Sequence, residues 1–379
     1  MNIGCSVYNL AFVDNWIKRL SPFMPDVTFH VFNIGKLQGR DKLTNINNIV
    51  FHDISDLSST GIICLFKKNN IELLLCFHYR SMIELLLQRI AVYLNIKQVY
   101  LEHGLQSANS DKFKTAKAKK EIVQTIFRNY NFLKKYFGFL IKHNQRRKEL
   151  LILYGIIIKN RFYLSPFDKY LIYSKRSYDM ICGKFNLKNE DNIIYIGYPI
   201  FENEMKKREA KSLIKNDGGI LYIHQPFILD GFATISYDEE KEYIKKLKEA
   251  LQHISDKITI LLHPRESIDE YIKRYKNTGI NVIQSPNNFK VFADKDLIIG
   301  HYSTALLSAL YFGKKTIVVE YPTAKLDGVF KDFCIYAQNV EALRNISVKE
   351  YNFKGINYLT GDINTYEHIA DTILSLKTN

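Results

Sequence analysis

Short apolar runs that end abruptly in polar residues constrain the fold of this chain more than any other feature. In the stretch 257–304, one such run ends at His263–Arg265 and a second ends at His301–Thr304, with helical spacing between them. Alternation of strand-length and helical segments predicts βαβ units and a parallel sheet. In open parallel sheets, ligands bind where strands end and helices begin. We therefore expect a ligand site at these two strand ends.

The same alternation extends over most of the 379 residues, a length that favours two domains. We expect an α/β chain with one domain over 1–165 and a second over 166–379, joined at Ser165-Pro166. The last helix, expected over 366–376, is free to pack back on the first domain. Strands are predicted at 2–7, 27–34, 49–54, 71–78 and 98–102, and then at 170–173, 192–196, 219–223, 257–262, 296–300 and 316–319.

Cysteine usage and hydropathy indicate a cytoplasmic protein. The five cysteines are scattered and have no CxxC spacing, which argues for reduced thiols and against a disulfide framework or a zinc site. The N-terminus starts directly as a strand, without the pattern of a signal peptide. No uncharged apolar run reaches the roughly 18 residues that a membrane-spanning helix needs.

The net charge of +14 is concentrated in one segment. Residues 112–161 hold fourteen Lys and Arg against Glu121 and Glu149, a net charge of +12. Aromatic and aliphatic residues interleave these cations, which predicts basic amphipathic helices. One interpretation is helices on the core with a solvated basic face. The other, which we favour, is a surface that rests on anionic lipid at the inner face of the cytoplasmic membrane; a groove for a polyanionic acceptor is a third use.

A nucleic-acid partner is disfavoured, although the isoelectric point is about 9.2. The excess of basic residues is confined to the segment 112–161, and no recognised nucleic-acid-reading module is present.

Four predicted strands of the second domain end in polar residues, namely Gln225, His263, Ser303 with Thr304, and Glu320. If the sheet is parallel, all four ends meet at one edge. Ser303 and Thr304 would open a helix, where hydroxyls, backbone N–H groups and the helix dipole suit a phosphate. The alternative is that Ser303 is simply an N-cap.

His263-Pro264-Arg265 favours the phosphate interpretation, because a second hydrogen-bonding and cationic group ends a neighbouring strand. Pro264 fixes the exit of the chain behind His263. Tyr302 directly precedes Ser303, and we expect it to take part in binding the nucleotide. Glu320 is placed to accept both hydroxyls of a ribose, although a solvated carboxylate is an equal alternative.

Other phosphate or metal motifs do not fit. Neither G-x-G-x-x-G nor G-x-x-x-x-G-K-[ST] occurs, which disfavours dinucleotide and P-loop enzymes. Asp294-Lys295-Asp296 resembles a metal-binding Asp-x-Asp, but it precedes a strand, so we expect a turn. No metal or cofactor is expected.

A His-Pro after an apolar strand, followed about forty residues later by a Ser/Thr pair that opens a helix, resembles the bacterial polysialyltransferases and lipooligosaccharide sialyltransferases. That family also has an acidic-acidic-Gly motif, matched here by Glu102-His103-Gly104, and a Gly-Gln-Pro-like turn, matched by His224-Gln225-Pro226. The likeness covers roughly residues 1–325. His103 departs from the pattern, since the family usually has a second acid there.

The resemblance implies a GT-B fold, in which two Rossmann-like domains with parallel sheets face each other across a cleft, the first for the acceptor and the second for the nucleotide. It implies an inverting, metal-independent transfer of sialic acid, or a related nonulosonic acid, from a CMP-activated donor to a bacterial capsule or lipooligosaccharide glycan. Glu102 would be the general base, with His103 and Gly104 on the acceptor side. His263 would bind the departing CMP phosphate, held also by Ser303 and Thr304. The alternatives are CMP-Kdo or CDP-glycerol as donor.

Overall fold

The fold was analysed in a computed structural model. The structure describes residues 1–6, 13–33, 48–77, 82–103, 134–143, 167–185, 187, 190–199, 218–229, 233–285, 288–311, 314–322, 330–331, 333–346, 361 and 365–376. These residues form two compact units. Unit 1 holds the described residues up to Pro199 together with Gly361 and residues 365–376, and unit 2 holds the described residues from 218 to 346.

Unit 1 is organised around a seven-stranded parallel sheet with the order β3-β2-β1-β4-β5-β6-β7. Its strands are β1 (Asn2–Ser6), β2 (Thr28–Asn33), β3 (Ile49–Asp53), β4 (Leu73–Cys76), β5 (Lys97–Leu101), β6 (Lys169–Ile172) and β7 (Ile193–Tyr195). Strand β4 is buried throughout, and β5 and β6 are buried beyond their first residue and are mostly apolar there, as expected where helices cover both faces of a parallel sheet.

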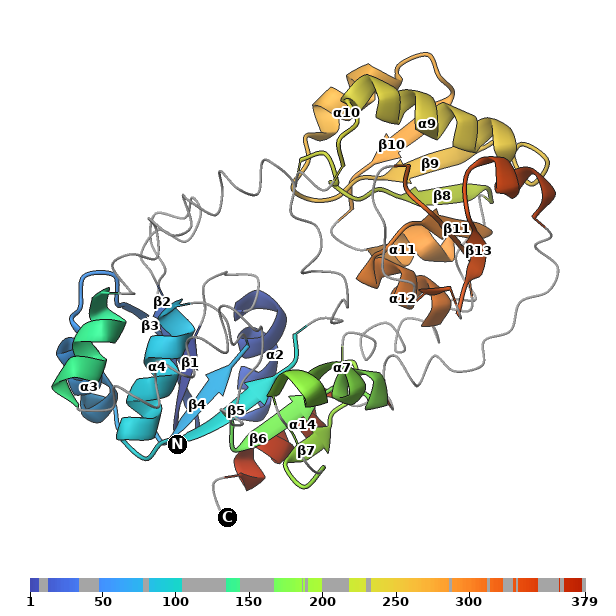
Figure 1. The fold of residues 1–379 in the computed structure, drawn as a ribbon. Helices are drawn as coiled ribbons and strands as arrows, with labels where there is room; N and C mark the ends of the chain where they lie inside the picture. The colour runs from blue at the N-terminus through green and yellow to red at the C-terminus, as the bar shows by residue number, and fades with distance from the viewer. Residues whose placement is uncertain are drawn as a thin grey trace. The chain divides into compact units, whose positions relative to one another are not determined.

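The helices of unit 1 are η1 (Val13–Ile17), α2 (Lys18–Leu20), η2 (Ser21–Phe23), α3 (Ser59–Lys68), α4 (Met82–Tyr93), helical residues 134–142, α7 (Lys175–Phe185) and α14 (Tyr366–Ser375). The last helix packs against α2, and its Tyr366 ring meets the ring of Trp16 in η1 edge-on at 5.9 Å. Lys97, which begins β5, donates to the carbonyl of Leu376. The final helix therefore belongs to unit 1 (Figure 1).

The expected boundary at Ser165-Pro166 is not where the structure divides the chain. Strands β6 and β7 continue the first sheet, with Leu171 of β6 opposite Leu101 of β5. The division comes after Pro199. The long stretch between β5 and β6 in the sequence made two neighbouring strands look like parts of different domains.

Unit 2 contains a six-stranded parallel sheet with the order β10-β9-β8-β11-β12-β13. Its strands are β8 (Ile220–Ile223), β9 (Ile258–Leu261), β10 (Ile280–Ile283), β11 (Leu297–Gly300), β12 (Lys315–Val319) and β13 (Ile335–Ala337). The strand order reverses between β8 and β11, because β9 and β10 lie on one side of this pair and β12 and β13 on the other. Such a reversal is where doubly wound sheets bind ligands.

Helices cover both faces of this sheet (Figure 1). They are α9 (Tyr237–Ala250), α10 (Ile268–Tyr275), α11 (Asn288–Ala293), α12 (Thr304–Tyr311) and the 3₁₀ helix η6 (Glu341–Asn345). Helix α9 begins with a capping box in which Ser236 and Glu239 satisfy each other's backbone N–H groups. Its buried face carries Tyr243, Ile244 and Leu247, together with one acid, Glu240.

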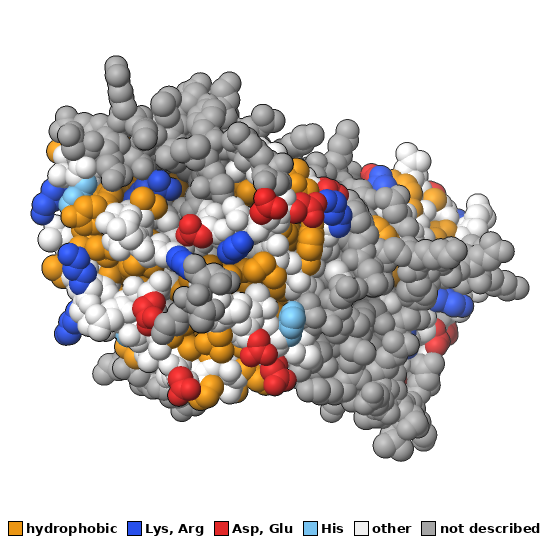
Figure 2. Space-filling model, turned by 90° about the horizontal axis from the view of Figure 1, so that it is seen from below, with side chains coloured by type: hydrophobic (Ala, Val, Ile, Leu, Met, Phe, Trp, Pro, Cys, Tyr) orange, Lys and Arg blue, Asp and Glu red, His pale blue; other side chains and the backbone are white. Residues whose placement is uncertain are grey.

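In the part of the chain that the structure describes, no helix is long and apolar enough to span a membrane. On the surface seen in Figure 2, the described Lys and Arg side chains lie among Asp and Glu side chains. Most of the basic segment 112–161 lies outside the described residues; helical residues 134–142 carry Lys134, Lys135 and Lys142.

Candidate functional site

The four polar strand ends predicted from the sequence lie at one edge of the second sheet. Gln225, His263, Ser303 and Glu320 follow the carboxyl ends of β8, β9, β11 and β12, which are consecutive neighbours in that sheet. The carboxyl ends of parallel strands share an edge, so the topology brings these tips together.

Gln225 and Tyr302 join the two strands at the point where the strand order reverses. The backbone N–H of Tyr302 donates to Oε1 of Gln225 at 2.7 Å. The ring of Tyr302 packs edge-on against Phe330, with 5.5 Å between centroids. This bridge fixes the backbone just before α12 begins.

His263 lies on a tight turn after β9. The N–H of Glu266 donates to the carbonyl of His263 at 3.0 Å, which closes the turn, and Pro264 and Arg265 at its tip are exposed. The backbone N–H of Arg265 donates to Nδ1 of His263 at 3.2 Å. Because Nδ1 accepts this hydrogen bond, the neutral imidazole carries its proton on Nε2.

Ser303 caps helix α12. Its hydroxyl accepts from the N–H of Ala305 at 3.2 Å, and its carbonyl accepts from Leu306 at 3.0 Å. Ser303 is therefore an N-cap, as the alternative interpretation predicted. Because its oxygen accepts in this cap, its O–H can still donate to a ligand. Thr304 is the first residue of α12. The helix start thus faces the same edge as His263 and Gln225, with backbone N–H groups suited to an anion.

Glu320 is not simply a solvated carboxylate. Its Oε1 accepts hydrogen bonds from the Lys331 ammonium at 2.9 Å and from the Tyr336 hydroxyl. Its side chain is one-third exposed, at 33%. It lines a pocket of about 680 Å³ between the N-terminal half of α9 and the segments after β12 and β13. The carboxylate is therefore held in one orientation by two partners.

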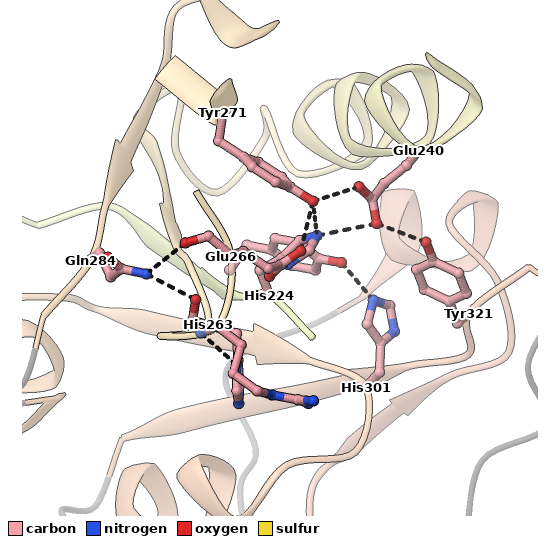
Figure 3. A network of polar contacts seen from close by, with 10 residues as sticks. His224, Glu240, His263, Glu266, Tyr271, Gln284, His301 and Tyr321 are labelled. Carbon is pink, nitrogen blue, oxygen red and sulfur yellow. Dashed lines mark hydrogen bonds and ion pairs between the residues drawn. The ribbon is translucent and has the colours of Figure 1, made fainter. Parts of the chain in front are cut away.

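A buried polar network lies behind this edge, and the sequence did not predict it (Figure 3). His224 is 2% exposed, and its ring lies between two carboxylates, at 2.8 Å from Glu266 and 3.1 Å from Glu240. The Tyr321 hydroxyl donates to Glu240 at 2.9 Å, and the Tyr271 hydroxyl lies between the two carboxylates, at 2.9 Å from Glu266 and 3.1 Å from Glu240. The visible signal was Glu240 itself, an acid at an apolar position of an amphipathic helix.

His301 is also buried, at the end of β11. Its Nδ1 faces the carbonyl of Val319 at 2.7 Å, and its Nε2 faces the Tyr222 hydroxyl at 2.7 Å. The carbonyl can only accept, so Nδ1 carries the proton and Tyr222 donates to Nε2. Burial lowers the pKa of His301 to about 4, so the ring is neutral at physiological pH.

Glu102, the expected general base, lies in unit 1 just after β5 and is completely buried. Its Oε2 accepts from the backbone N–H of Tyr173 at 2.7 Å, and its Oε1 accepts from the Ser177 hydroxyl at 2.9 Å. Burial raises the pKa of Glu102 to about 7, against these hydrogen bonds and the nearby charge of Arg176. A carboxyl group of this pKa exchanges its proton near neutral pH.

His103 follows directly and is only partly buried. Burial lowers the pKa of His103 to about 4, opposed by a hydrogen bond with the Phe77 backbone. Its imidazole is therefore neutral at physiological pH. Gly104 lies outside the described residues.

Metal ligands do not gather among the described residues, where no cluster of three or more His, Cys, Asp or Glu could hold an ion. Asp294 and Asp296 form the turn before β11 that the sequence predicted. Oδ2 of Asp296 accepts from the backbone N–H of Gly219 at 3.1 Å, which ties this turn to the start of β8.

Comparisons with known proteins add to this geometry. No protein-family model and no curated protein matches the sequence, whereas solved structures do match. The UDP-GlcNAc 2-epimerase from Methanocaldococcus jannaschii is 14% identical, with a TM-score of 0.55 over 99% of each chain. The wall teichoic acid polymerase TagF is 13% identical, with a TM-score of 0.54 over 100% of this chain and 89% of that chain. A putative UDP-N-acetylglucosamine 2-epimerase from Listeria monocytogenes is 13% identical, with a TM-score of 0.52 over 99% of this chain and 95% of that chain.

The fold is of the GT-B type. Two parallel α/β sheets, each in a Rossmann-like unit, account for the likeness over nearly the full length. At 11 to 14% identity the likeness concerns the fold, and the activity has to be argued from the residues at the strand ends.

Proposed function

We propose that this chain is a glycosyltransferase that uses a nucleotide-activated donor, and that its donor is a CMP-activated sialic acid or related nonulosonic acid. The acceptor is a bacterial surface glycan, and the transfer inverts the anomeric centre without a metal. The observation that carries the proposal is the convergence of Gln225, His263 and Ser303 on one sheet edge, at and beside the point where the strand order reverses.

This edge suits the leaving nucleotide. The Nε2–H of His263 and the Ser303 O–H are donors, and the start of α12 adds backbone N–H groups and the positive end of the helix dipole. Charge that builds on a departing phosphate is stabilised by donors aimed at it. Arg265 adds a cation to the same donor set. Glu320 would accept the ribose hydroxyls.

In unit 1, Glu102 would take the proton from the acceptor hydroxyl. A carboxyl with its pKa near 7 is poised for this role at neutral pH. His103 is a second candidate for the base, since it is more exposed than Glu102 and its imidazole is neutral. Either group would give a direct displacement, and hence inversion.

A second candidate function is transfer of glycerol phosphate from CDP-glycerol to a teichoic-type polymer. The likeness to TagF, which was solved with CDPG, supports it. His103, at which this chain departs from the sialyltransferase pattern, is compatible with a donor other than sialic acid. The likeness to the epimerase solved with UDP-GlcNAc and UDP also makes UDP-GlcNAc a donor worth testing.

The basic segment 112–161 would hold the enzyme against the anionic inner face of the cytoplasmic membrane, where lipid-linked glycans are assembled. Its interleaved aromatic residues and its net charge of +12 support this placement.

The test is a donor panel. Purified protein is incubated with CMP-sialic acid, CMP-Kdo, CDP-glycerol and UDP-GlcNAc, and nucleotide release is followed with and without a glycan acceptor. Release of CMP from CMP-sialic acid supports the first proposal. Turnover of CDP-glycerol alone replaces it with the second. Conversion of UDP-GlcNAc into its 2-epimer, detected by chromatography of the nucleotide sugars, contradicts both.

A further inference from the structure

The buried network behind the sheet edge is anchored by His224. Both nitrogens of its ring face carboxylate oxygens, with Nδ1 at 2.8 Å from Glu266 and Nε2 at 3.1 Å from Glu240. An ionised carboxylate only accepts hydrogen bonds, so both nitrogens must carry protons. With both carboxyl groups ionised, this geometry places an imidazolium between two carboxylates.

The protonation equilibrium agrees with this geometry. Burial lowers the pKa of His224, but the hydrogen bonds to Glu240 and Glu266 outweigh burial and raise the pKa to about 9. Other titratable groups also face the cluster. Tyr271 lies within 3.4 Å of Nε2, and the rings of Tyr222 and Tyr271 meet the imidazole edge-on. His301 is neutral and belongs to the neighbouring strand end.

On one side, His224 contacts Glu266, which belongs to the turn at the candidate site. Glu266 closes the turn that begins at His263. The side-chain amide of Gln284 donates to the carbonyls of His263 and Glu266, at 2.9 Å and 3.2 Å. Gln284 thus holds the backbone at both ends of the turn, and the Glu266 carboxylate also ties its end to His224 (Figure 3). Between these ends, the N–H of Arg265 orients the His263 ring.

On its other side, His224 contacts Glu240, which is not part of the turn that carries His263. Glu240 belongs to α9, and it also accepts from the Tyr321 hydroxyl at 2.9 Å. The Tyr271 hydroxyl is shared by the two carboxylates, at 2.9 Å from Glu266 and 3.1 Å from Glu240. Glu240 and Glu266 therefore hold the same imidazolium at similar distances, but only Glu266 is part of the turn that carries His263.

We propose that His224 is a positioning residue: as an imidazolium it holds Glu266, and through Glu266 it fixes the turn that presents His263 and Arg265 at the sheet edge. The inference rests on the proposed function in one respect, namely that this turn binds the phosphate of the donor nucleotide. His224 itself, 2% exposed, does not touch the substrate.

The test compares His224→Gln and Glu266→Gln with Glu240→Gln as the matched control. Each Glu→Gln change removes one charge from one side of the same ring. Two readouts are used: the side-chain signals of His263 in heteronuclear NMR of the nucleotide-free protein, and the affinity for CMP. Thermal melting records the loss of stability, which we expect in all three variants.

His224→Gln and Glu266→Gln should shift the His263 ring signals and weaken CMP binding about tenfold, the size expected for a lost charged hydrogen bond. Glu240→Gln should leave both readouts near wild type although it also lowers the melting temperature. Equal effects of Glu240→Gln and Glu266→Gln on His263, or unchanged His263 signals in His224→Gln, would overturn the inference. If the wild-type protein binds no nucleotide, the proposed function fails, and the His263 signals alone decide the positioning role.

Discussion

The backbone N–H of Tyr302 donates a 2.7 Å hydrogen bond to Oε1 of Gln225, and this bond spans the two strands at which the order of the second sheet reverses. It places the start of α12 beside the end of β8. The turn that carries His263 follows β9, the next strand along. The candidate nucleotide site is therefore a product of sheet topology, tightened by one side-chain amide.

Replacing Gln225 separates this structural role from ligand binding. Gln225→Ala removes the acceptor and should cost about 1 kcal/mol of stability while weakening CMP binding. Gln225→Glu keeps an acceptor for the Tyr302 N–H but brings a negative charge beside the proposed phosphate, so stability should survive and CMP binding should be lost. Chemical denaturation and calorimetric titration measure the two effects. Undiminished CMP binding by Gln225→Glu would place the phosphate elsewhere.

The pH dependence of transfer distinguishes the two candidate bases. The pKa of Glu102 is raised to about 7, so a reaction that uses its carboxylate should accelerate as pH rises through about 7. The pKa of His103 is lowered to about 4, so a reaction that uses its neutral imidazole should already be at full rate near pH 6. The initial rate at saturating donor, measured across this range, decides between them.

Substitution of each candidate base tests the same assignment. In Glu102→Gln the side chain can still accept from the Tyr173 N–H and donate to the Ser177 hydroxyl, so the protein should fold and bind CMP. Transfer should be abolished if Glu102 is the base. Full activity in Glu102→Gln together with a large loss in His103→Ala would assign the role to His103.

Because of His224, the free energy of unfolding should fall as the pH rises into the alkaline range. Its pKa is raised from 6.5 to about 9, so the stabilisation is complete below about 6.5 and is lost as pH rises through 9. The shift corresponds to about 3 kcal/mol. Urea unfolding near pH 7 and near pH 10 should show this loss in the wild type and in the control His368→Gln, whose side chain is exposed. The same pH dependence in His224→Gln would show that another group is responsible.

The proposed role of Glu320 predicts that the site binds ribonucleotides more tightly than 2′-deoxyribonucleotides. Its carboxylate, held by Lys331 and Tyr336, should accept the ribose hydroxyls, so CMP should bind about tenfold more tightly than its 2′-deoxy form. Glu320→Gln should remove most of this preference, whereas Lys331→Ala, which leaves the bond from Tyr336, should retain it. Competition binding with the two nucleotides provides the measurement, and equal affinities in the wild type would contradict the role.

The local sequence pattern was sufficient to predict most strands and the sheet edge at which their polar ends meet, because each apolar run is adjacent in sequence to its polar end. It was insufficient where distant segments decide the outcome. Strand β6 joins the first sheet only through its register with β5, across a long intervening stretch. The short strand β10 was hidden in a segment that looked helical.

The network around His224 could not have been predicted for the same reason. Glu240 and Glu266 are 16 and 42 residues away from it along the chain. His224 was visible only as a neighbour of Gln225, and Glu266 only as the residue after Arg265. Their pairing depends on how α9 and the turn after β9 pack against the sheet.

The central claim, that the edge carrying His263 binds the donor nucleotide while Glu102 acts only on the acceptor, is tested most directly by calorimetric titration of CMP into the wild type, Glu102→Gln and His263→Ala. The account predicts equal affinity for the wild type and Glu102→Gln, and at least a tenfold loss in His263→Ala, of the order expected for a hydrogen bond to a charged phosphate. Wild-type affinity in His263→Ala, or no binding of CMP by the wild type, would contradict it.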